Sequence, residues 1–264
     1  MLYEFVTRPL IAGNWKMHGL KAQLGEICAM AATAAEAPDV DILICPPATL
    51  IERAVRAAAG RLLIGGQDCH SEVSGAFTGD VSARMLKDDG ASAVIVGHSE
   101  RRKAHGETDA IVAAKARAAR QAGLMAIICV GEAGADRDAG RALAVCARQV
   151  VASVPRGMGG ADCAIAYEPL WAIGQDEAAN PEAIVEMHGH IRQTLIRHLG
   201  ATGALVRILY GGSVTGENAA GILSLPEVNG ALVGRESLSF APFEAIIRAA
   251  AAVSHPKDIR YAKS

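Results

Sequence analysis

The sequence predicts an α/β protein built as a (β/α)8 barrel, a closed sheet of eight parallel strands, in one domain that covers residues 1–264. Short apolar runs alternate with longer segments of helical periodicity from one end of the chain to the other. The length of 264 residues suits this fold, which takes about 250. Side chains that can act in acid–base chemistry follow several of the apolar runs. This is expected of a parallel α/β fold, in which the carboxyl ends of the strands share one face.

Eight apolar runs are expected to form strands, near residues 10–13, 40–45, 62–66, 93–97, 124–130, 163–167, 206–210 and 230–233. Helical spacing is evident in residues 109–122, 141–154 and 181–199. Asp109 and Asn180-Pro181 are typical helix starts, and Gly123 and Gly200 are typical stops. An open doubly wound sheet of six or seven units is the alternative. No G-x-G-x-x-G follows the first run, which weakens its dinucleotide-binding form.

The composition narrows the classes of function. Hydrophobic residues make up 51% and charged residues 20%, which supports a large core. The formal net charge of −2 argues against nucleic acid or an anionic membrane as the main partner. No apolar run approaches the roughly 18 residues of a membrane helix, and the start of the chain lacks a signal-peptide pattern. Six cysteines without C-x-x-C spacing favour a reducing, cytoplasmic setting.

Three of the apolar runs end in side chains that suit acid–base chemistry. Lys16 follows the first run, His98 the fourth and Glu168 the sixth. A lysine neutralises an anionic substrate, a histidine polarises oxygen, and a glutamate takes a proton from carbon. Each has an ordinary alternative, as a solvated lysine, a helix-capping histidine or an ion-paired glutamate. Their joint position after parallel strands favours a shared active site.

Glycine-rich segments follow the last two runs. Gly211, Gly212 and Ser213 come after the seventh run, and Gly234 and Arg235 after the eighth. Barrels often bind phosphate with backbone N–H groups of these two loops and of a short helix. Glycine also lets the chain approach a bound oxygen closely. The pattern predicts a phosphate site, and simple turn formation is the alternative.

Glu186, His188 and His190 resemble a metal-binding set only at first sight. Helical residues two positions apart point to nearly opposite faces, so the two histidines do not easily share one ion. We expect a solvated helix face here and no metal site.

Six segments, in order along the chain, resemble the triosephosphate isomerase family. They are Asn14-Trp15-Lys16, Ser74-Gly75-Ala76-Phe77-Thr78-Gly79, Gly97-His98-Ser99-Glu100-Arg101-Arg102, Cys129-Val130-Gly131-Glu132, Tyr167-Glu168-Pro169-Leu170-Trp171-Ala172-Ile173-Gly174 and Tyr210-Gly211-Gly212-Ser213. The resemblance implies a (β/α)8 barrel that interconverts dihydroxyacetone phosphate and D-glyceraldehyde 3-phosphate, without metal or organic cofactor. This matches the phosphorylated substrate that the glycine-rich loops predict.

The resemblance also implies a role for each catalytic residue. Glu168 would move the proton between two carbons, and His98 would act as a neutral imidazole that polarises the carbonyl. Lys16 would offset the phosphate and enediolate charge, and Asn14 would orient Lys16 and the substrate. Triosephosphate isomerase is itself a well-known example of a catalytic histidine that a helix N-terminus keeps neutral.

Supporting roles follow in the same way. Glu100 would help to position the catalytic Lys and Glu, Ser99 would open the helix after the catalytic His, and Cys129 would support the site from the fifth strand.

Four positions would hold the phosphate: Gly174, Ser213, and the backbone N–H groups of Gly234 and Arg235. The loop over residues 169–178 would close over the substrate, exclude water and retain the enediolate phosphate.

Members of the family usually pair as dimers. The loop over residues 74–79 would reach into the neighbouring subunit, with Thr78 close to the neighbour's Asn14 and Lys16. His18 stands in a loop expected at this interface, where the family usually has Asn. We therefore expect a homodimer whose isolated subunit is poorly active.

Two more departures from the family pattern bear on function. Gln175-Asp176-Glu177 replaces the usual Thr-Gly-Lys at the far hinge of the lid, and Arg235 replaces a usual Gly in the phosphate loop. The Arg235 N–H can still donate if its φ angle is not positive. These departures leave open an isomerase of a four-carbon tetrulose phosphate. A barrel that binds a sugar phosphate without turnover is the alternative outside enzymes.

Overall fold

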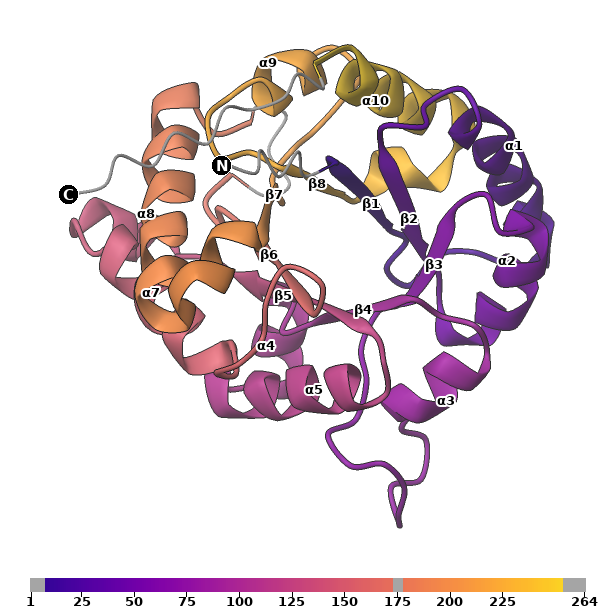
Figure 1. Cartoon of the computed structure of the whole chain (residues 1–264), viewed down its shortest axis with the longest axis horizontal. Helices are drawn as coiled ribbons and strands as arrows, with labels where there is room; N and C mark the ends of the chain where they lie inside the picture. The colour runs from indigo at the N-terminus through magenta and orange to yellow at the C-terminus, as the bar shows by residue number, and fades with distance from the viewer. Residues whose placement is uncertain (1–7, 173–177, 254–264) are drawn as a thin grey trace.

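In the computed structural model, the described residues are 8–172 and 178–253. Eight parallel strands close into a barrel in chain order, with the first strand paired to both the second and the eighth. Their bounds are β1 (Leu10–Asn14), β2 (Asp41–Cys45), β3 (Leu63–Gly66), β4 (Ala93–Val96), β5 (Met125–Val130), β6 (Cys163–Tyr167), β7 (Arg207–Tyr210) and β8 (Gly230–Val233). Figure 1 shows the strands at the centre of a ring of helices. The predicted barrel is confirmed, and the open-sheet alternative is wrong.

Ten α-helices and four short 3-10 helices lie within the described residues. The α-helices are α1 (Leu24–Ala34), α2 (Ile51–Ala58), α3 (Ala83–Asp88), α4 (Ser99–His105), α5 (Asp109–Gln121), α6 (Gly134–Asp138), α7 (Ala142–Ser153), α8 (Pro181–Leu199), α9 (Ala219–Leu223) and α10 (Phe240–Val253). The 3-10 helices are η1 (Lys21–Gln23), η2 (Ala48–Leu50), η3 (Gly200–Leu205) and η4 (Arg235–Leu238). The segment between β3 and α3 projects outward from the ring (Figure 1).

Local capping explains why the predicted helix ends are correct to within a residue. The Thr108 side chain accepts the N–H of Ile111 and so caps α5. Asn180 caps α8 in the same way, with Pro181 in the first turn. These side chains bind N–H groups that the helix itself leaves unpaired. Gly200, at a φ angle of 70°, ends α8.

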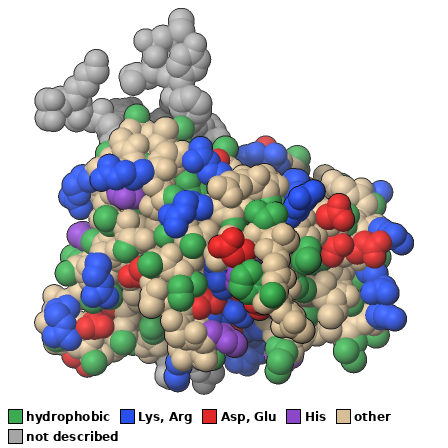
Figure 2. All heavy atoms as spheres, turned by 90° about the horizontal axis from the view of Figure 1, so that it is seen from below, with side chains coloured by type: hydrophobic (Ala, Val, Ile, Leu, Met, Phe, Trp, Pro, Cys, Tyr) green, Lys and Arg blue, Asp and Glu red, His purple; other side chains and the backbone are tan. Residues whose placement is uncertain are grey.

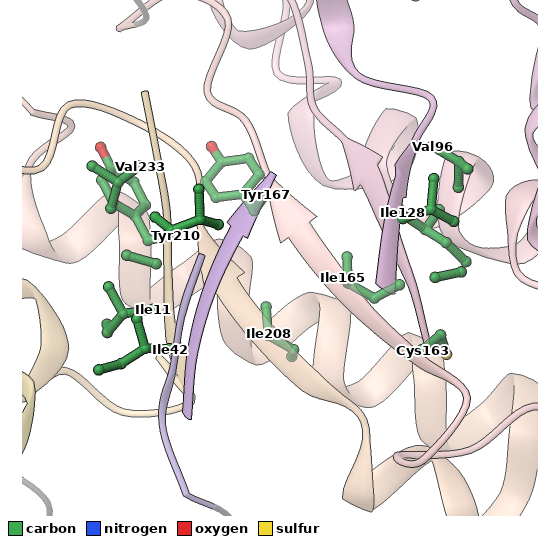
Figure 3. Packing of buried hydrophobic residues seen from close by; sticks show 14 of the residues in the cluster. Ile11, Ile42, Val96, Ile128, Cys163, Ile165, Tyr167, Ile208, Tyr210 and Val233 are labelled. Atoms are coloured by element: carbon green, nitrogen blue, oxygen red, sulfur yellow. The ribbon is translucent and has the colours of Figure 1, made fainter. Parts of the chain in front are cut away.

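Two hydrophobic clusters form the core, one on each face of the barrel wall. The smaller cluster consists of strand residues such as Leu10, Ala12, Ala164 and Ala166, and it fills the barrel interior. The larger cluster packs the outer face of the strands against the helices. Figure 3 shows part of this outer layer, including Ile165 of β6 and Ile208 of β7. Side chains alternate between the two clusters because successive residues of a strand point to opposite faces.

The expected solvated face of α8 is wrong for one residue. His188 is fully buried, and its Nδ1 lies 3.1 Å from the carbonyl oxygen of Glu227. Its ring also packs edge-on against Tyr167, with ring centroids 5.8 Å apart. Glu186 is exposed and His190 half-buried, so this part of α8 turns one histidine toward the barrel and leaves the carboxylate outside.

The surface carries charges of both signs. On the face drawn in Figure 2, Lys and Arg side chains alternate with Asp, Glu and hydrophobic side chains. Within residues 8–172 and 178–253, no helix combines the length and apolarity needed to cross a membrane. The single domain over residues 1–264 stays a prediction.

Candidate active site

The alternation of side chains along the strands directs candidate catalytic groups to the mouth of the barrel. Ala166 points into the interior, so Glu168, two residues further on, continues toward the same side. Asn14 follows Ala12 in the same way at the end of β1. The sequence pattern of the buried strands therefore brings side chains from distant parts of the chain to one place.

Lys16 lies in a conformation that only a few non-glycine residues adopt. Its φ angle is 52°, in the left-handed region, and its N–H donates to Asn14 Oδ1 at 3.0 Å. The ammonium Nζ lies 2.5 Å from Glu100 Oε1. Partial burial raises the pKa of Glu100, but the hydrogen bond and charge of Lys16 outweigh it and hold that pKa below its ordinary value.

His98 caps the N-terminus of α4. Its Nδ1 accepts the backbone N–H of Glu100 at 3.2 Å. A nitrogen that accepts an N–H carries no proton, so the neutral ring has its proton on Nε2. That Nε2 lies 3.1 Å from Glu168 Oε1. The helix start therefore sets both the tautomer of the ring and the atom that it presents to the site.

Glu168 is almost completely buried, with 2% of its surface exposed. The Ser99 N–H donates to its Oε2 at 3.0 Å, and the Ser99 hydroxyl donates to its Oε1 at 2.8 Å. With the His98 ring, the carboxylate therefore has three polar neighbours within hydrogen-bond distance. Such contacts compensate for the removal of a charged carboxylate from water.

Cys129 is a fully buried residue of β5 beside this carboxylate. Burial raises the pKa of its thiol well above the ordinary value, and the negative charge of Glu168 raises it further. The thiol is therefore neutral at physiological pH. It contributes packing and a weak hydrogen-bonding group, without a charge of its own.

A cavity of about 390 Å³ brings the candidate catalytic and phosphate-binding residues together. Its lining includes the predicted residues Asn14, Lys16, His98, Glu168, Ser213, Gly234 and Arg235. Gly211 and Gly212 line the same cavity. Within the described residues, the only non-glycine residues with positive φ angles are Lys16, Ala59 and Glu227, so Arg235 meets the condition set for its N–H.

The structure places four other predicted residues outside the main cavity. Ser99 and Cys129 line a neighbouring cavity of about 320 Å³, which also touches Glu168. Glu100 binds Lys16 from the side, and Thr78 lies in the exposed loop between β3 and α3. Gly174 and the hinge residues 175–177 lie outside the described residues.

The cavity lining also includes residues that the sequence analysis did not assign to the substrate site, among them His18 and Trp15. His18, which the sequence analysis expected at the dimer interface, lines the cavity. Trp15 is buried, and its Nε1 donates to the carbonyl oxygen of Ser237 at 2.8 Å. This bond ties the segment that carries Lys16 to η4 beside the phosphate loop. Its only trace in the sequence is a large aromatic residue beside a lysine.

Comparison with known proteins agrees with this geometry. The family model of triosephosphate isomerase matches residues 9–250. The triosephosphate isomerase of Afipia carboxidovorans is 58% identical over 244 residues, covering 92% of this chain and 97% of that protein. That of Rhodopseudomonas palustris is 54% identical, covering 90% and 96%. The crystal structure of triosephosphate isomerase from Bartonella henselae has a TM-score of 0.86 at 46% identity, covering 92% of this chain and 98% of that one.

The barrel and its cavity define an aldose–ketose isomerase that acts on a phosphorylated sugar. Together with the matches over nearly the whole length, they show that the chain belongs to the triosephosphate isomerase family. Its reaction is the interconversion of D-glyceraldehyde 3-phosphate and dihydroxyacetone phosphate through an enediolate.

Proposed function

We propose that Glu168, His98 and Lys16 carry out the isomerisation in the cavity of about 390 Å³. The observation that supports this most directly is the 3.1 Å separation of His98 Nε2 and Glu168 Oε1, because both groups must reach adjacent atoms of one small substrate.

In the proposed reaction, the Glu168 carboxylate takes a proton from the carbon beside the carbonyl group. The electron pair of the broken C–H bond forms the C=C bond of the enediolate, and the carbonyl oxygen gains negative charge. His98 donates its Nε2–H to that oxygen, and Lys16 offsets the charge of the enediolate phosphate. The imidazole then takes back a proton from the hydroxyl group on the carbon that lost its hydrogen, and that oxygen becomes the new carbonyl group. Glu168 returns its proton to the former carbonyl carbon, which completes the aldose–ketose exchange and restores both catalytic groups.

The proposed reaction includes a movement of Glu168. Two hydrogen bonds from Ser99 hold its carboxylate in the present position. We infer that substrate binding draws the carboxylate away from Ser99 and toward the reacting carbon. Ser99 thus supports a resting position for the base, in addition to opening α4.

We propose that the backbone N–H groups of Gly234 and Arg235, together with the hydroxyl of Ser213, bind the substrate phosphate. All three residues line the same cavity as Lys16. Gly174 remains part of this proposal from the sequence alone. Asn14 holds Lys16 in its left-handed conformation, and Glu100 orients the ammonium group.

We also propose that the protein acts as a homodimer. Large hydrophobic side chains stand exposed on the segments after β1 and β3: Met17 by 95%, Leu20 by 75%, Val73 by 51% and Phe77 by 42%. Exposed apolar groups clustered on projecting loops are typical of an interface. Thr78 would then approach the partner's site, with His18 at the contact. Sedimentation and activity on dilution test this, and a fully active monomer would contradict it.

For the location, we propose the cytoplasm. All six cysteines are free thiols, which fits a reducing compartment.

The catalytic assignment is tested by Glu168→Asp, which withdraws the carboxylate by one methylene and keeps its charge. We expect kcat to fall about 10²-fold or more with little change in KM, because misplacement by about 1 Å has that effect. The matched control is Glu182→Asp in the first turn of α8, an exposed position, where kcat should stay at the wild-type value. An unchanged kcat in the Glu168 variant would exclude Glu168 as the base.

A further inference from the structure

The carboxyl end of β5 lies between the two strand ends that carry the catalytic pair. β5 pairs with β4, which leads to His98, and with β6, which leads to Glu168. The pairing with β6 continues past the strand, because the Glu168 N–H donates to the Val130 carbonyl at 2.7 Å. The position of β5 at this end therefore sets the distance between the imidazole and the carboxylate.

Gln149 of α7 binds the main chain at this end of β5. Its Oε1 accepts the Gly131 N–H at 2.8 Å, and its Nε2 donates to the Gly131 carbonyl at 3.0 Å. One side-chain amide thus pairs both backbone groups, as a neighbouring strand would. Gly131 in turn lies directly against the main chain of Glu168, since a Cβ atom at residue 131 would stand 1.9 Å from the Glu168 carbonyl oxygen.

Arg102 of α4 binds the strand ends from the same outer side. Its Nε donates to the Gly97 carbonyl at 2.8 Å, and its Nη2 donates to the Cys129 carbonyl at 3.1 Å. Gly97 directly precedes His98, so one guanidinium group connects the chain at the imidazole with β5. An ion pair with Asp109 at 2.6 Å holds the guanidinium in place.

Packing is incomplete in this region. Arg102, Gln149 and Glu168 all line a cavity of about 320 Å³. Side chains elsewhere in a protein core are close-packed, so a displacement meets immediate resistance. Here the directional hydrogen bonds from α4 and α7 supply that resistance.

We propose that Arg102 and Gln149 are positioning residues that set the separation of His98 and Glu168. Neither lines the substrate cavity, and they act through the main chain at residues 97, 129 and 131. This inference rests on the roles proposed above for His98 and Glu168.

The test replaces Gln149 with Leu, a side chain of similar size that forms neither hydrogen bond. We expect kcat to fall about 10- to 100-fold, since small misplacements of catalytic groups carry penalties of this order. KM should stay within about twofold, because the phosphate loops are unchanged. Arg148→Leu is the matched control on the same helix, at an exposed position, and should retain wild-type kcat.

A second measurement separates positioning from general structural damage. 2-Phosphoglycolate, whose carboxylate imitates the enediolate, should bind Gln149→Leu more weakly by a factor close to the fall in kcat. Inorganic phosphate, which engages only the phosphate loops, should bind as in the wild type. When Glu168→Asp is already present, adding Gln149→Leu should lower kcat by less than about threefold, because the separation of His98 and Glu168 that Gln149 maintains is already disturbed. The proposal would be overturned if both anions bound equally more weakly, or if the losses of kcat in the double variant were additive.

Two further variants guard against a misfolded protein. Gln149→Glu keeps the size and one acceptor, and Arg102→Lys keeps the charge but loses the fork of donors. Both should lower kcat in the folded enzyme, as judged by chemical denaturation. Wild-type kcat in the folded variants, or failure of all three to fold, would overturn the positioning role. If Glu168→Asp alone leaves kcat unchanged, the fault lies instead in the proposed catalytic base.

Discussion

Gly211, at the end of β7, offers a sharp test of how closely the barrel mouth is packed around the base. Its N–H donates to the Tyr167 carbonyl at 2.7 Å, one residue before Glu168. A Cβ atom at this position would stand 2.9 Å from that carbonyl oxygen and 3.2 Å from Cγ of Glu168. Gly211→Ala therefore pushes against both the backbone of β6 and the catalytic side chain.

The expected size of the effect follows from these contacts. A methyl group normally rests well beyond 3 Å from a carbonyl oxygen, so the two strand ends must separate by a few tenths of an ångström. Adding a methyl group to a well-packed site costs about 1–3 kcal/mol of stability. A shift of a few tenths of an ångström at Glu168 should lower kcat about tenfold, given about 10²-fold for 1 Å.

Steady-state kinetics and urea denaturation measure the two effects together. Gly189→Ala is the matched control, because nothing lies within 4 Å of a Cβ at that position in α8. There the same change should stabilise the protein by about 0.5–1 kcal/mol and leave kcat alone. If Gly211→Ala keeps wild-type kcat and matches the control in stability, the reasoning from these contacts is wrong.

Two further predictions concern buried charge and the phosphate loop. Lys115 Nζ is largely buried and lies 2.6 Å from Glu107 and 2.8 Å from Asp68, so Lys115→Met should cost about 3–5 kcal/mol of stability in urea denaturation. Arg248→Met, at an exposed ion pair, should leave the stability close to the wild-type value. Burial raises the pKa of Glu107, but the hydrogen bonds and charges of Lys115 and Arg101 outweigh burial and leave that pKa below its ordinary value. The stabilisation of the folded state by the Glu107 ion pairs is therefore present above about pH 4.3 and is lost as the pH falls further. The difference between Lys115→Met and wild type should therefore shrink in acid, and a constant difference would contradict it. If the backbone of residue 235 is what binds phosphate, Arg235→Ala should raise KM less than about threefold with kcat unchanged, and a rise above tenfold would assign the binding to the guanidinium.

Most of the fold can be predicted from the sequence because strands and helices follow patterns of neighbouring residues. Apolar runs of four to seven residues, separated by helical periodicity, mark each strand to within about one residue, as at Cys163–Tyr167. The same period of two explains why Glu168 and Asn14 reach one mouth. The polar residues two positions from His188 indicated a solvated face, but His188 shares a helix face with the buried residues Ile184 and Ile191 and packs on Tyr167.

The residues that support the site were harder to predict. Gln149 stands in the middle of a helix with no motif around it, and its partner Gly131 is 18 positions away in the sequence. The bond from Trp15 to the carbonyl of Ser237 spans 222 positions. Contacts of side chains with distant backbone groups leave no periodic signal, so they emerge only when the barrel is closed.

The most direct test of the account is a coupled assay of the purified protein with D-glyceraldehyde 3-phosphate, run beside a tetrulose phosphate. We expect a kcat/KM for the triose near the diffusional ceiling of about 10⁸ M⁻¹s⁻¹, and slower turnover of the four-carbon sugar. Weak turnover of the triose with faster turnover of the tetrulose phosphate would contradict the account. It would direct attention to Arg235 and to the lid hinge at residues 175–177.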